Sequence, residues 1–368
     1  MRELFEQMSQ SIASGDSFVL SVIIDSSGSS PRDSGAIMLS GPQGRIWGSV
    51  GGALAEHRVI ENAGELLAQR CGCSLRRFSL DVSDDGPLRA DATGADSVDA
   101  VCGGEIAVFS RFIDAALAGL ADLIQKGIDC FSEKESSWLI IGISDSSADA
   151  AAPPGADDIP SLCLARTRGE ICGAIAAVGI QPPDIPALLA EKPKCADQGG
   201  RRWFSLPLTQ AGFVYVFGGG HVAQELVPLL DRLDFRAVVF DDREEFTRAQ
   251  LFPNAVKIIR GDFTRIGGSL SLEAGDYAVI ATKGHRWDFH AESFALASPA
   301  RYIGVIGSKK KHAFVEGQLR AAGFTHEQIH APRVHAPIGI DIGSKTPAEL
   351  AVSIAAELIN VRHQSQPV

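Results

Sequence analysis

The chain has 368 residues, of which 34 are basic and 45 acidic, so its formal net charge is −11. Nucleic-acid affinity comes mostly from Lys and Arg side chains that neutralise phosphates, so this acidic balance argues against a nucleic-acid partner. No apolar run approaches the roughly 18 residues of a membrane span, and we expect no membrane partner either. A chain of this length predicts two domains.

The first residues and the cysteines bear on the cellular compartment. Residues 1–8 have the pattern of an amphipathic helix and include acids, which is unlike a signal peptide. The seven cysteines include no C-x-x-C pair, and Cys71 with Cys73 are too few for a closed zinc site. We therefore expect free thiols, a reducing cytoplasm, and no metal site built from protein ligands.

The first half of the chain alternates strand and helix signals, which predicts an α/β domain with a mixed sheet over residues 1–210. Polar segments at 81–99 and 144–160 are expected to be mobile loops, and a Pro-, Lys- and Gly-rich connector is expected near 181–205. The predicted strands are 18–24, 36–39, 45–47, 75–80, 105–112, 138–143, 161–165 and 171–176, and the predicted helices are 53–69 and 115–126, the latter closed by Gly127.

The second half, residues 211–368, has a cleaner pattern. Near-continuous apolar strands alternate with helical stretches, which predicts a Rossmann-like, doubly wound parallel sheet buried on both faces. Thr346 and Glu349 form a capping box with Pro347 at the first helical position of the last helix. The predicted strands are 213–217, 237–240, 256–259, 277–281 and 302–306.

The 38 glycines gather in clusters, and one cluster follows a buried strand and opens a helix. Residues 218–223 match the dinucleotide fingerprint G-x-G-x-x-A: Gly218 makes the turn, Gly220 lets a phosphate approach, and Ala223 packs helix on sheet. Asp241 follows about 20 residues later and suits a ribose 2′-hydroxyl. A tight turn that binds nothing is the plain alternative. The candidate binding residues here are Gly218, Gly219, Gly220, His221, Ala223 and Asp241.

Further polar loops follow strands of this half or precede its last helix. Open α/β sheets bind ligands at the carboxyl ends of their strands, so these loops are candidates for a binding rim. The other interpretation is that the basic run 309–311 is solvated and His285 is an ordinary loop histidine, and spacing alone does not decide between the two. The candidates are Lys283, His285, Ser308, His335 and Asp341.

The first half carries glycine-rich loops of its own. Residues 28–32 combine glycine, small hydroxyls and an arginine, which suits an anion, and residues 48–52 lead into a helix whose N–H groups also favour anions. Taken singly, each is more often a turn, and a lone cysteine is more often a small core residue than a nucleophile. The candidates are Gly28, Ser29, Ser30, Arg32, Gly51, Gly52, Glu56, Cys102, Gly103 and Gly104.

This ordered set of motifs resembles the XdhC/CoxI family, the xanthine dehydrogenase accessory factors, across essentially the whole chain. One position departs from the family pattern: Ala53 stands where the family usually has a third glycine. The motifs that carry the resemblance are 28–36, 48–56 and 102–104 in the first half and 217–221, 241–243, 282–285, 303–309 and 335–343 in the second.

The resemblance implies a chaperone rather than a catalyst. Family members bind the molybdenum cofactor, shield it, support its sulfuration by a cysteine desulfurase, and hand it to a molybdenum hydroxylase such as xanthine dehydrogenase. In that role N–H groups and Arg32 would hold the cofactor phosphate, and Cys102 would approach molybdenum or transfer sulfur. The Rossmann half would hold a nucleotide appended to the pterin or a separate NAD, and we expect a homodimer.

Two other classes of function stay open. An NAD-dependent oxidoreductase would use Lys283 or His285 as its proton-transfer group, although the first half offers no recognisable acid/base pair. A non-catalytic scaffold would have lost the nucleotide and would only contact the hydroxylase. No catalytic residue is assigned, and the candidates are Cys102, Lys283 and His285.

Overall fold

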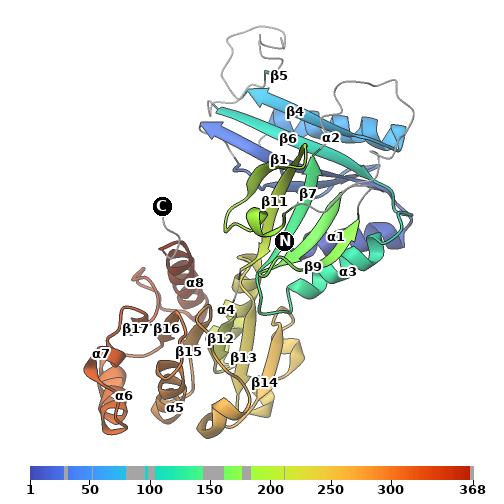
Figure 1. Ribbon diagram of the computed structural model, residues 1–368. Coiled ribbons are helices and arrows are strands. Elements are labelled where there is room, and N and C mark those ends of the chain that lie inside the picture. Colours follow the sequence, from blue (N-terminus) through green and yellow to red (C-terminus); the bar gives the residue numbers. More distant parts are fainter. Residues whose placement is uncertain are drawn as a thin grey trace. The chain divides into compact units, whose positions relative to one another are not determined.

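The chain divides into two compact units, Met1–Gln210 and Ala211–Val368, and each is described by itself (Figure 1). Within the described residues, no helix is long and apolar enough to cross a membrane. The predicted mobile loops lie outside these residues, except that 96–97 form a short strand. The computed structural model describes residues 1–28, 32–51, 53–79, 96–97, 104–143, 161–175, 184–210 and 212–364.

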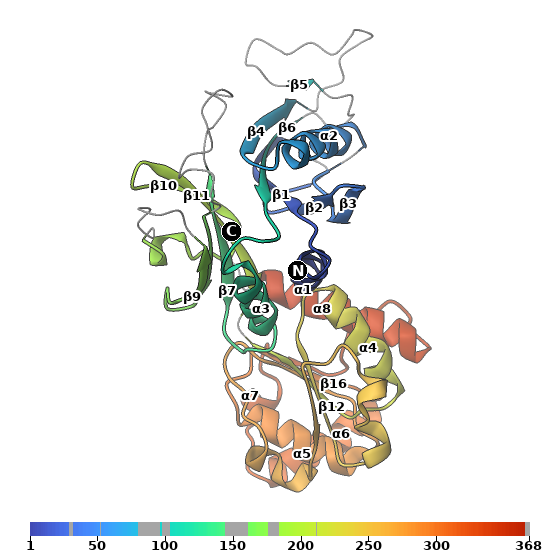
Figure 2. The ribbon, with the colours of Figure 1, turned by 90° about the vertical axis from the view of Figure 1, so that its right-hand side faces the viewer.

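Unit 1, Met1–Gln210, contains two sheets. Sheet A has six strands in the order β3-β2-β1-β6-β4-β5, and its neighbours run antiparallel except β4 and β5. Helix α2 (Ala53–Gln69) lies along one face of this sheet (Figures 1 and 2). A mixed sheet with a covering helix confirms the α/β class. The strands are β1 (Phe18–Gly28), β2 (Ile37–Gly41), β3 (Gly44–Gly48), β4 (Cys73–Ser79), β5 (Asp96–Ser97) and β6 (Gly104–Ile113).

Sheet B of unit 1 is antiparallel, with five strands in the order β10-β11-β7-β8-β9. Its strands are β7 (Ser137–Ile143), β8 (Leu162–Arg166), β9 (Ile171–Ile175), β10 (Lys194–Gln198) and β11 (Arg201–Thr209). The other helices among the described residues of this unit are α1 (Arg2–Ala13), α3 (Leu120–Cys130) and the 3₁₀ helix η2 (Pro186–Leu188).

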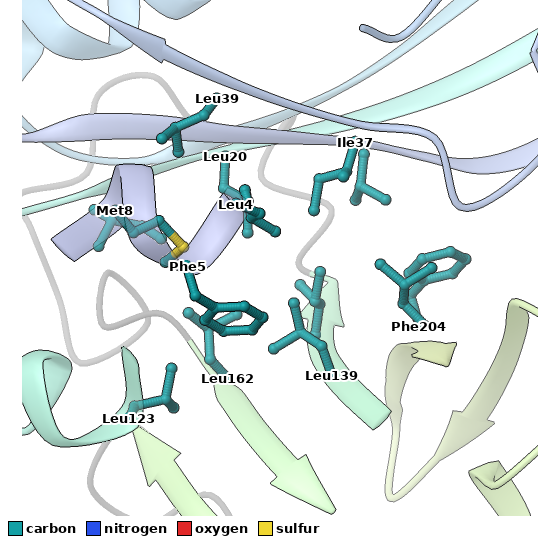
Figure 3. Packing of buried hydrophobic residues seen from close by; sticks show 14 of the residues in the cluster. Leu4, Phe5, Met8, Leu20, Ile37, Leu39, Leu123, Leu139, Leu162 and Phe204 are labelled. Atoms are coloured by element: carbon teal, nitrogen blue, oxygen red, sulfur yellow. The ribbon is translucent and has the colours of Figure 1, made fainter. Parts of the chain in front are cut away.

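The main core of unit 1 is shared by the two sheets. Leu20 and Leu39 enter it from sheet A (Figure 3). Leu139 and Phe204 enter it from sheet B, and Phe5 enters from α1. Because successive side chains of a strand point to opposite faces, the intervening residues of β1 fill smaller cores on the other side of sheet A. Burial on both faces explains the continuous apolar run of the first predicted strand.

Two expectations for unit 1 are wrong. The predicted connector at 181–205 contains β10 and the start of β11, and β11 pairs with both β10 and β7. Arginines and a proline interrupt the apolar alternation of β11, which hides the strand. Helix α3 begins at Leu120 and passes through Gly127 rather than ending there. A Cβ at Gly127 would lie 2.3 Å from Cε1 of Phe5, so this glycine admits close packing of α1.

Unit 2, Ala211–Val368, is built on a six-stranded parallel sheet C in the order β14-β13-β12-β15-β16-β17. If the six strands are numbered by their order in the chain, they lie across the sheet in the order 3-2-1-4-5-6, which is the Rossmann arrangement. The doubly wound prediction is confirmed. The strands are β12 (Val214–Phe217), β13 (Ala237–Asp241), β14 (Lys257–Arg260), β15 (Tyr277–Ile280), β16 (Tyr302–Val305) and β17 (Val334–His335).

Helices cover both faces of sheet C. Alternate residues of its strands pack with α4 (His221–Arg232) and α8 (Pro347–Gln364) on one face. The intervening residues pack with α5 (His285–Leu296) and α6 (Lys309–Ala321) on the other. The remaining helices are α7 (His326–Ile329) and the 3₁₀ helices η3 (Glu244–Phe246), η4 (Ala249–Leu251) and η5 (Phe263–Gly268).

The predicted capping box at the start of α8 is confirmed. Oγ1 of Thr346 accepts from the backbone N–H of Glu349 at 3.2 Å, and the Glu349 carboxylate accepts from the Thr346 N–H at 3.0 Å. These bonds satisfy backbone donors that the first helical turn leaves without partners.

Candidate functional site

The glycine turn between β12 and α4 is the centre of the site in unit 2. Gly218 has φ of +110°, and a Cβ there would lie 2.4 Å from the Ala281 carbonyl oxygen. A Cβ at Gly219 would lie 2.3 Å from the Phe246 carbonyl oxygen, whereas one at Gly220 would have open space around it. Gly218 and Gly219 therefore allow the turn to pack closely against its neighbours. Gly220 leaves the backbone at the N-terminus of α4 accessible, and a helix N-terminus favours anions. Ala223 is buried between helix and sheet.

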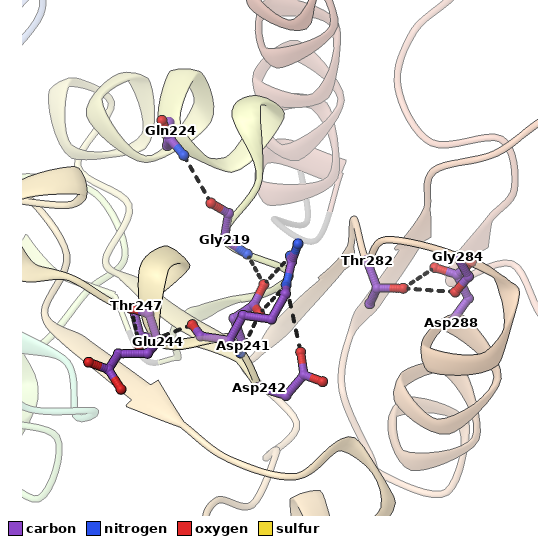
Figure 4. Close-up of polar contacts among 10 residues, drawn as sticks. Gly219, Gln224, Asp241, Asp242, Glu244, Thr247, Thr282, Gly284 and Asp288 are labelled. Carbon is purple, nitrogen blue, oxygen red and sulfur yellow. Dashed lines mark hydrogen bonds and ion pairs between the residues drawn. The ribbon is translucent and has the colours of Figure 1, made fainter.

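Asp241 lies at the end of β13, where a ribose-binding acid is expected, but its carboxylate is engaged by the protein. The Gly219 N–H donates to Oδ2 at 2.7 Å, and the Arg243 guanidinium donates to both oxygens at 2.9 and 2.8 Å (Figure 4). Burial alone would raise the pKa of Asp241, but the hydrogen bonds from Arg243 and Gly219 outweigh it and lower the pKa. Asp241 thus ties the glycine turn to Arg243, which stacks 3.9 Å over the Phe246 ring.

The loop after β15 is joined to the loop after β16 through a buried carboxylate. Thr282 Oγ1 donates to Oδ1 of Asp288 at 2.7 Å (Figure 4), and Lys311 Nζ lies 2.5 Å from Oδ2. Lys311 also donates to the Ile306 carbonyl oxygen at 3.1 Å. The basic run at 309–311 is therefore not uniformly solvated, because its third lysine is part of this network.

A second buried acid, Glu292, lies one helical turn after Asp288 on α5. Burial, and secondarily the charge of Asp288, raises the pKa of Glu292 to about 7. Burial also lowers the pKa of His312, so its imidazole favours the neutral form. Neither Glu292 nor His312 was among the predicted site residues, although the i, i+4 spacing of Asp288 and Glu292 was a visible signal for the first of them.

The other predicted rim residues of unit 2 divide into two groups. Lys283 and His285 are exposed; Lys283 lies in the loop after β15, which passes beside Gly218 at Ala281, and His285 is the first residue of α5. The His285 ring meets the ring of Phe314 edge-on at 5.0 Å. Ser308, in contrast, caps α6 by accepting from the backbone N–H of Lys311 at 3.3 Å.

His335 and Asp341 lie in the segment before α8. Nδ1 of His335 is 3.1 Å from Oε1 of Glu357, and Tyr302 and the Gly339 N–H donate to the other oxygen of that carboxylate. Burial would raise the pKa of Glu357, but the bonds from His335, Tyr302 and Gly339 lower it. His335 therefore joins a network inside unit 2, while Asp341 is exposed and accepts only locally, from the Gly343 N–H at 3.3 Å.

Strand pairing brings two glycine loops of unit 1 together at one end of sheet A. Gly28, the last residue of β1, pairs with Gly104, the first residue of β6. Ser79 at the end of β4 pairs with Glu105. Strand β3 runs in the same direction as β1, but its last residue, Gly48, pairs with Met38, which in turn pairs with Ser21, so it ends level with the middle of β1. The segment that leads into Gly104 and the segment that follows Gly28 are therefore joined to paired residues of sheet A.

Glu56 holds the loop that leads from β3 into α2. Arg45 Nη1 donates to its Oε1 at 2.7 Å, and Ser49 Oγ donates to Oε2 at 2.5 Å. Gly51 has φ of +133°. Arg32 is exposed in the loop after β1. The candidates that lie outside the described residues are Ser29, Ser30, Gly52, Cys102 and Gly103.

A thiol that the sequence analysis did not single out has an unusual environment in unit 1. A hydrogen bond with Cys130, reinforced by Arg166, lowers the pKa of Cys172 to about 6. Burial raises the pKa of Cys163 and of Cys195 to about 11. No motif marks Cys172, because Cys130 comes from α3, a distant part of the chain.

The strand order and the glycine turn define unit 2 as a Rossmann domain, attached to an α/β unit with glycine loops at one end of a sheet. Residues 214–358 match the model of the XdhC Rossmann domain, and residues 11–79 match that of the XdhC and CoxI family. The two matches together span more than half of the chain. The chain belongs to the XdhC and CoxI family, as the motifs predicted.

Similar proteins agree with this assignment. The chain is 24% identical over 349 residues to the uncharacterized protein YqeB of Escherichia coli K12, covering 95% of this chain and 44% of that protein. It is 29% identical over 147 residues to a probable xanthine dehydrogenase subunit of Bacillus subtilis 168, covering 40% and 42%. Both matches therefore span less than half of the relative's length.

A crystal structure described as a xanthine dehydrogenase from Bacillus halodurans has the same fold. The TM-score is 0.72 at 21% identity, and the match covers 99% of this chain and 96% of that one.

Proposed function

We propose that this protein is an accessory protein for a molybdenum hydroxylase of the xanthine dehydrogenase type. It binds the molybdenum cofactor as cargo, shields it, supports its sulfuration and delivers it. Family membership and the names of two relatives support the class of client. The observation that carries the proposed binding site is the pairing of Gly28 with Gly104, which joins two of the predicted cofactor loops.

Residues in the glycine loops of unit 1 fit an anionic cargo. Molybdopterin carries a terminal phosphate, and the net charge of −11 means that local donors must hold it. Gly28 has φ of +68° and Gly51 has φ of +133°, backbone conformations that favour glycine and that recur in anion-binding nests. The exposed guanidinium of Arg32 would add a charge-assisted hydrogen bond.

In the same proposal the Rossmann unit holds a nucleotide, either the one appended to a pterin or NAD. The open side of Gly220 supports phosphate approach at this turn. Because Asp241 already accepts four hydrogen bonds from Gly219 and Arg243, its proposed role is to position the turn, rather than to bind a ribose directly. Lys283 and His285 would contact the ligand from the neighbouring loop.

The sulfuration step adds partners to the proposal. A cysteine desulfurase would supply sulfur, Cys102 would approach molybdenum or transfer the sulfur, and the protein would act as a homodimer. These assignments rest on the family resemblance. A Cys102→Ala variant that binds cofactor normally and still yields an active, sulfurated hydroxylase would remove the cysteine from the mechanism.

The direct test is to co-express the full chain with cofactor biosynthesis and to measure molybdenum and oxidised-pterin fluorescence on the purified protein. We expect about one of each per chain. Arg32→Ala should weaken retention by roughly 10-fold or more, because a charge-assisted hydrogen bond is worth about 1.5–3 kcal/mol. Arg168→Ala, which removes an exposed arginine of the β8–β9 hairpin, is the matched control and should retain both.

Two results would replace the proposal. Bound nucleotide without pterin, together with a substrate-dependent change in nicotinamide absorbance, would establish an oxidoreductase, with Lys283 or His285 as the group to mutate next. Calorimetry that detects neither pterin nor nucleotide binding would leave a scaffold that only contacts the hydroxylase.

A further inference from the structure

Two histidines and a glutamate come together on the surface of unit 2, apart from the glycine turn. Glu316 lies on α6, His326 is the first residue of α7, and His330 directly follows α7. One ligand atom from each residue lies within 4.8 Å of the other two. The two imidazole rings are 4.2 Å apart between centroids.

These ligand atoms already surround a positive charge. Nη2 of Arg320 is 2.5 Å from Oε1 of Glu316 and 3.1 Å from Nδ1 of His326. Nε2 of His330 is 3.1 Å from the same glutamate oxygen. The carboxylate and the His326 lone pair are therefore aimed at one point, which a guanidinium occupies.

Local structure holds the three ligands in place. Thr325 and Gln328 form a capping box that orders α7, so His326 and His330 stand one turn apart on one face. Ile329, between them in sequence, is 5% exposed and belongs to the same core cluster as Leu319 of α6. Packing thus anchors α7 against the helix that carries the glutamate.

We propose that Glu316, His326 and His330 form a zinc site in which the metal replaces the guanidinium of Arg320. Two imidazole nitrogens and one carboxylate are common zinc ligands, and a nitrogen-rich set favours zinc over magnesium or calcium. The fourth position would be open to water or to a group from another molecule. This site is independent of the proposed cofactor function, and it differs from our expectation of no metal site built from protein ligands.

The change needed to bind the metal is small. Ligand atoms of a tetrahedral zinc ion with bonds of about 2.1 Å lie about 3.4 Å apart, so the present spacing of up to 4.8 Å must close by up to about 1.4 Å. Arg320 is half-exposed and can swing into solvent, which frees Glu316. His330 must then carry its ring proton on Nδ1, so that Nε2 presents its lone pair to the metal.

The test is a zinc titration by calorimetry on the metal-free, full-length protein. Glu316→Gln and His330→Ala should each weaken the site by roughly tenfold or more, the scale at which lost metal-site contacts act. Arg320→Ala should instead tighten it, because the competing cation is gone. His363→Ala removes an exposed histidine of α8 and should change nothing. Thermal unfolding of each variant checks that it is folded.

The seven cysteines could also bind zinc, so cobalt spectra are needed to identify the ligands. We expect a site without a thiolate-to-cobalt charge-transfer band, lost in the His326→Ala/His330→Ala double variant. Zinc affinity that is unchanged in both Glu316→Gln and the double variant would overturn the proposal. So would a thiolate band that survives in both, or equal affinity for magnesium.

Discussion

Glu292 illustrates how one side chain of unit 2 depends on its surroundings. It is 5% exposed, and its Oε2 has no hydrogen-bond partner among the described residues. Asp288, one turn earlier on α5, is fully buried and paired with Lys311. A carboxyl group in this position favours its neutral form, because burial removes the water that would stabilise the charge.

The raised pKa of Glu292 predicts a pH-dependent stability. Its folded pKa of about 7 lies above the ordinary value of 4.5, so the folded state binds the proton more tightly. The free energy of unfolding should therefore fall as pH rises from about 4.5 to 7, by at most about 3 kcal/mol. Glu292→Gln should remove this loss and be more stable than the parent at pH 8, but not at pH 4. Urea unfolding at both values measures the difference.

The matched control is Glu327→Gln, which changes an exposed carboxylate on α7. It should leave the pH dependence of unfolding as it is in the parent. If Glu292→Gln and Glu327→Gln give the same pH profile as the parent chain, the neutral form of Glu292 contributes nothing to stability.

At the scale of elements, two helical glycines have opposite roles. Gly127 of α3 meets α1 so closely that a Cβ would fall 2.3 Å from the Phe5 ring. Gly64 of α2 is exposed, and a Cβ there would meet nothing within 4 Å. Helix propensity predicts the same effect of alanine at both positions, and only the packing of neighbouring elements distinguishes the two.

We expect alanine at these two positions to change stability in opposite directions. Gly64→Ala should stabilise the protein by up to about 1 kcal/mol, the helix-propensity gain of alanine. Gly127→Ala receives the same gain but must displace Phe5, at an overpacking cost of about 1–3 kcal/mol, so it should be destabilising. Urea unfolding followed by circular dichroism compares the two, and equal stabilisation by both would show that α1 yields to the added methyl.

At the scale of the whole molecule, the two units have separate cores. Both core clusters of unit 2 draw only on residues from 213 onward, and every strand of sheet C comes from this unit. A part of the chain with its own closed core and sheet can in principle fold alone. Trp287, the one tryptophan after residue 211, stacks on Phe263 at 5.5 Å and reports on this unit.

We predict that residues 211–368 fold as an isolated fragment. Its Trp287 fluorescence should change in one cooperative transition during urea unfolding. A fragment that ends at residue 346 lacks α8 and should not fold, because Ala351, Ile354 and Leu358 are buried in the core of sheet C. A gradual, non-cooperative change in the longer fragment would mean that unit 2 depends on unit 1.

Local patterns in the chain were enough to predict the Rossmann unit. Apolar strands, the turn at Gly218 and the capping box at Thr346 act over a few residues, and the parallel order follows from βαβ chirality and connection rules. The family motifs also sufficed to identify the family. Strand β11 was not predicted. Arg201, Arg202 and Pro207 interrupt its alternation of apolar and polar residues, and its partner β7 is distant in the sequence.

The partner that each polar side chain binds, in contrast, was decided only by tertiary contacts. Asp241 was expected to face a ribose, yet the folded chain brings the Gly219 N–H and Arg243 to its carboxylate. Glu316 and His330 are 14 residues apart and no spacing rule joins them, but the packing of α7 on α6 makes them partners. Side-chain partners follow from which elements pack together, and that information is spread over the whole chain, rather than held in any short segment of it.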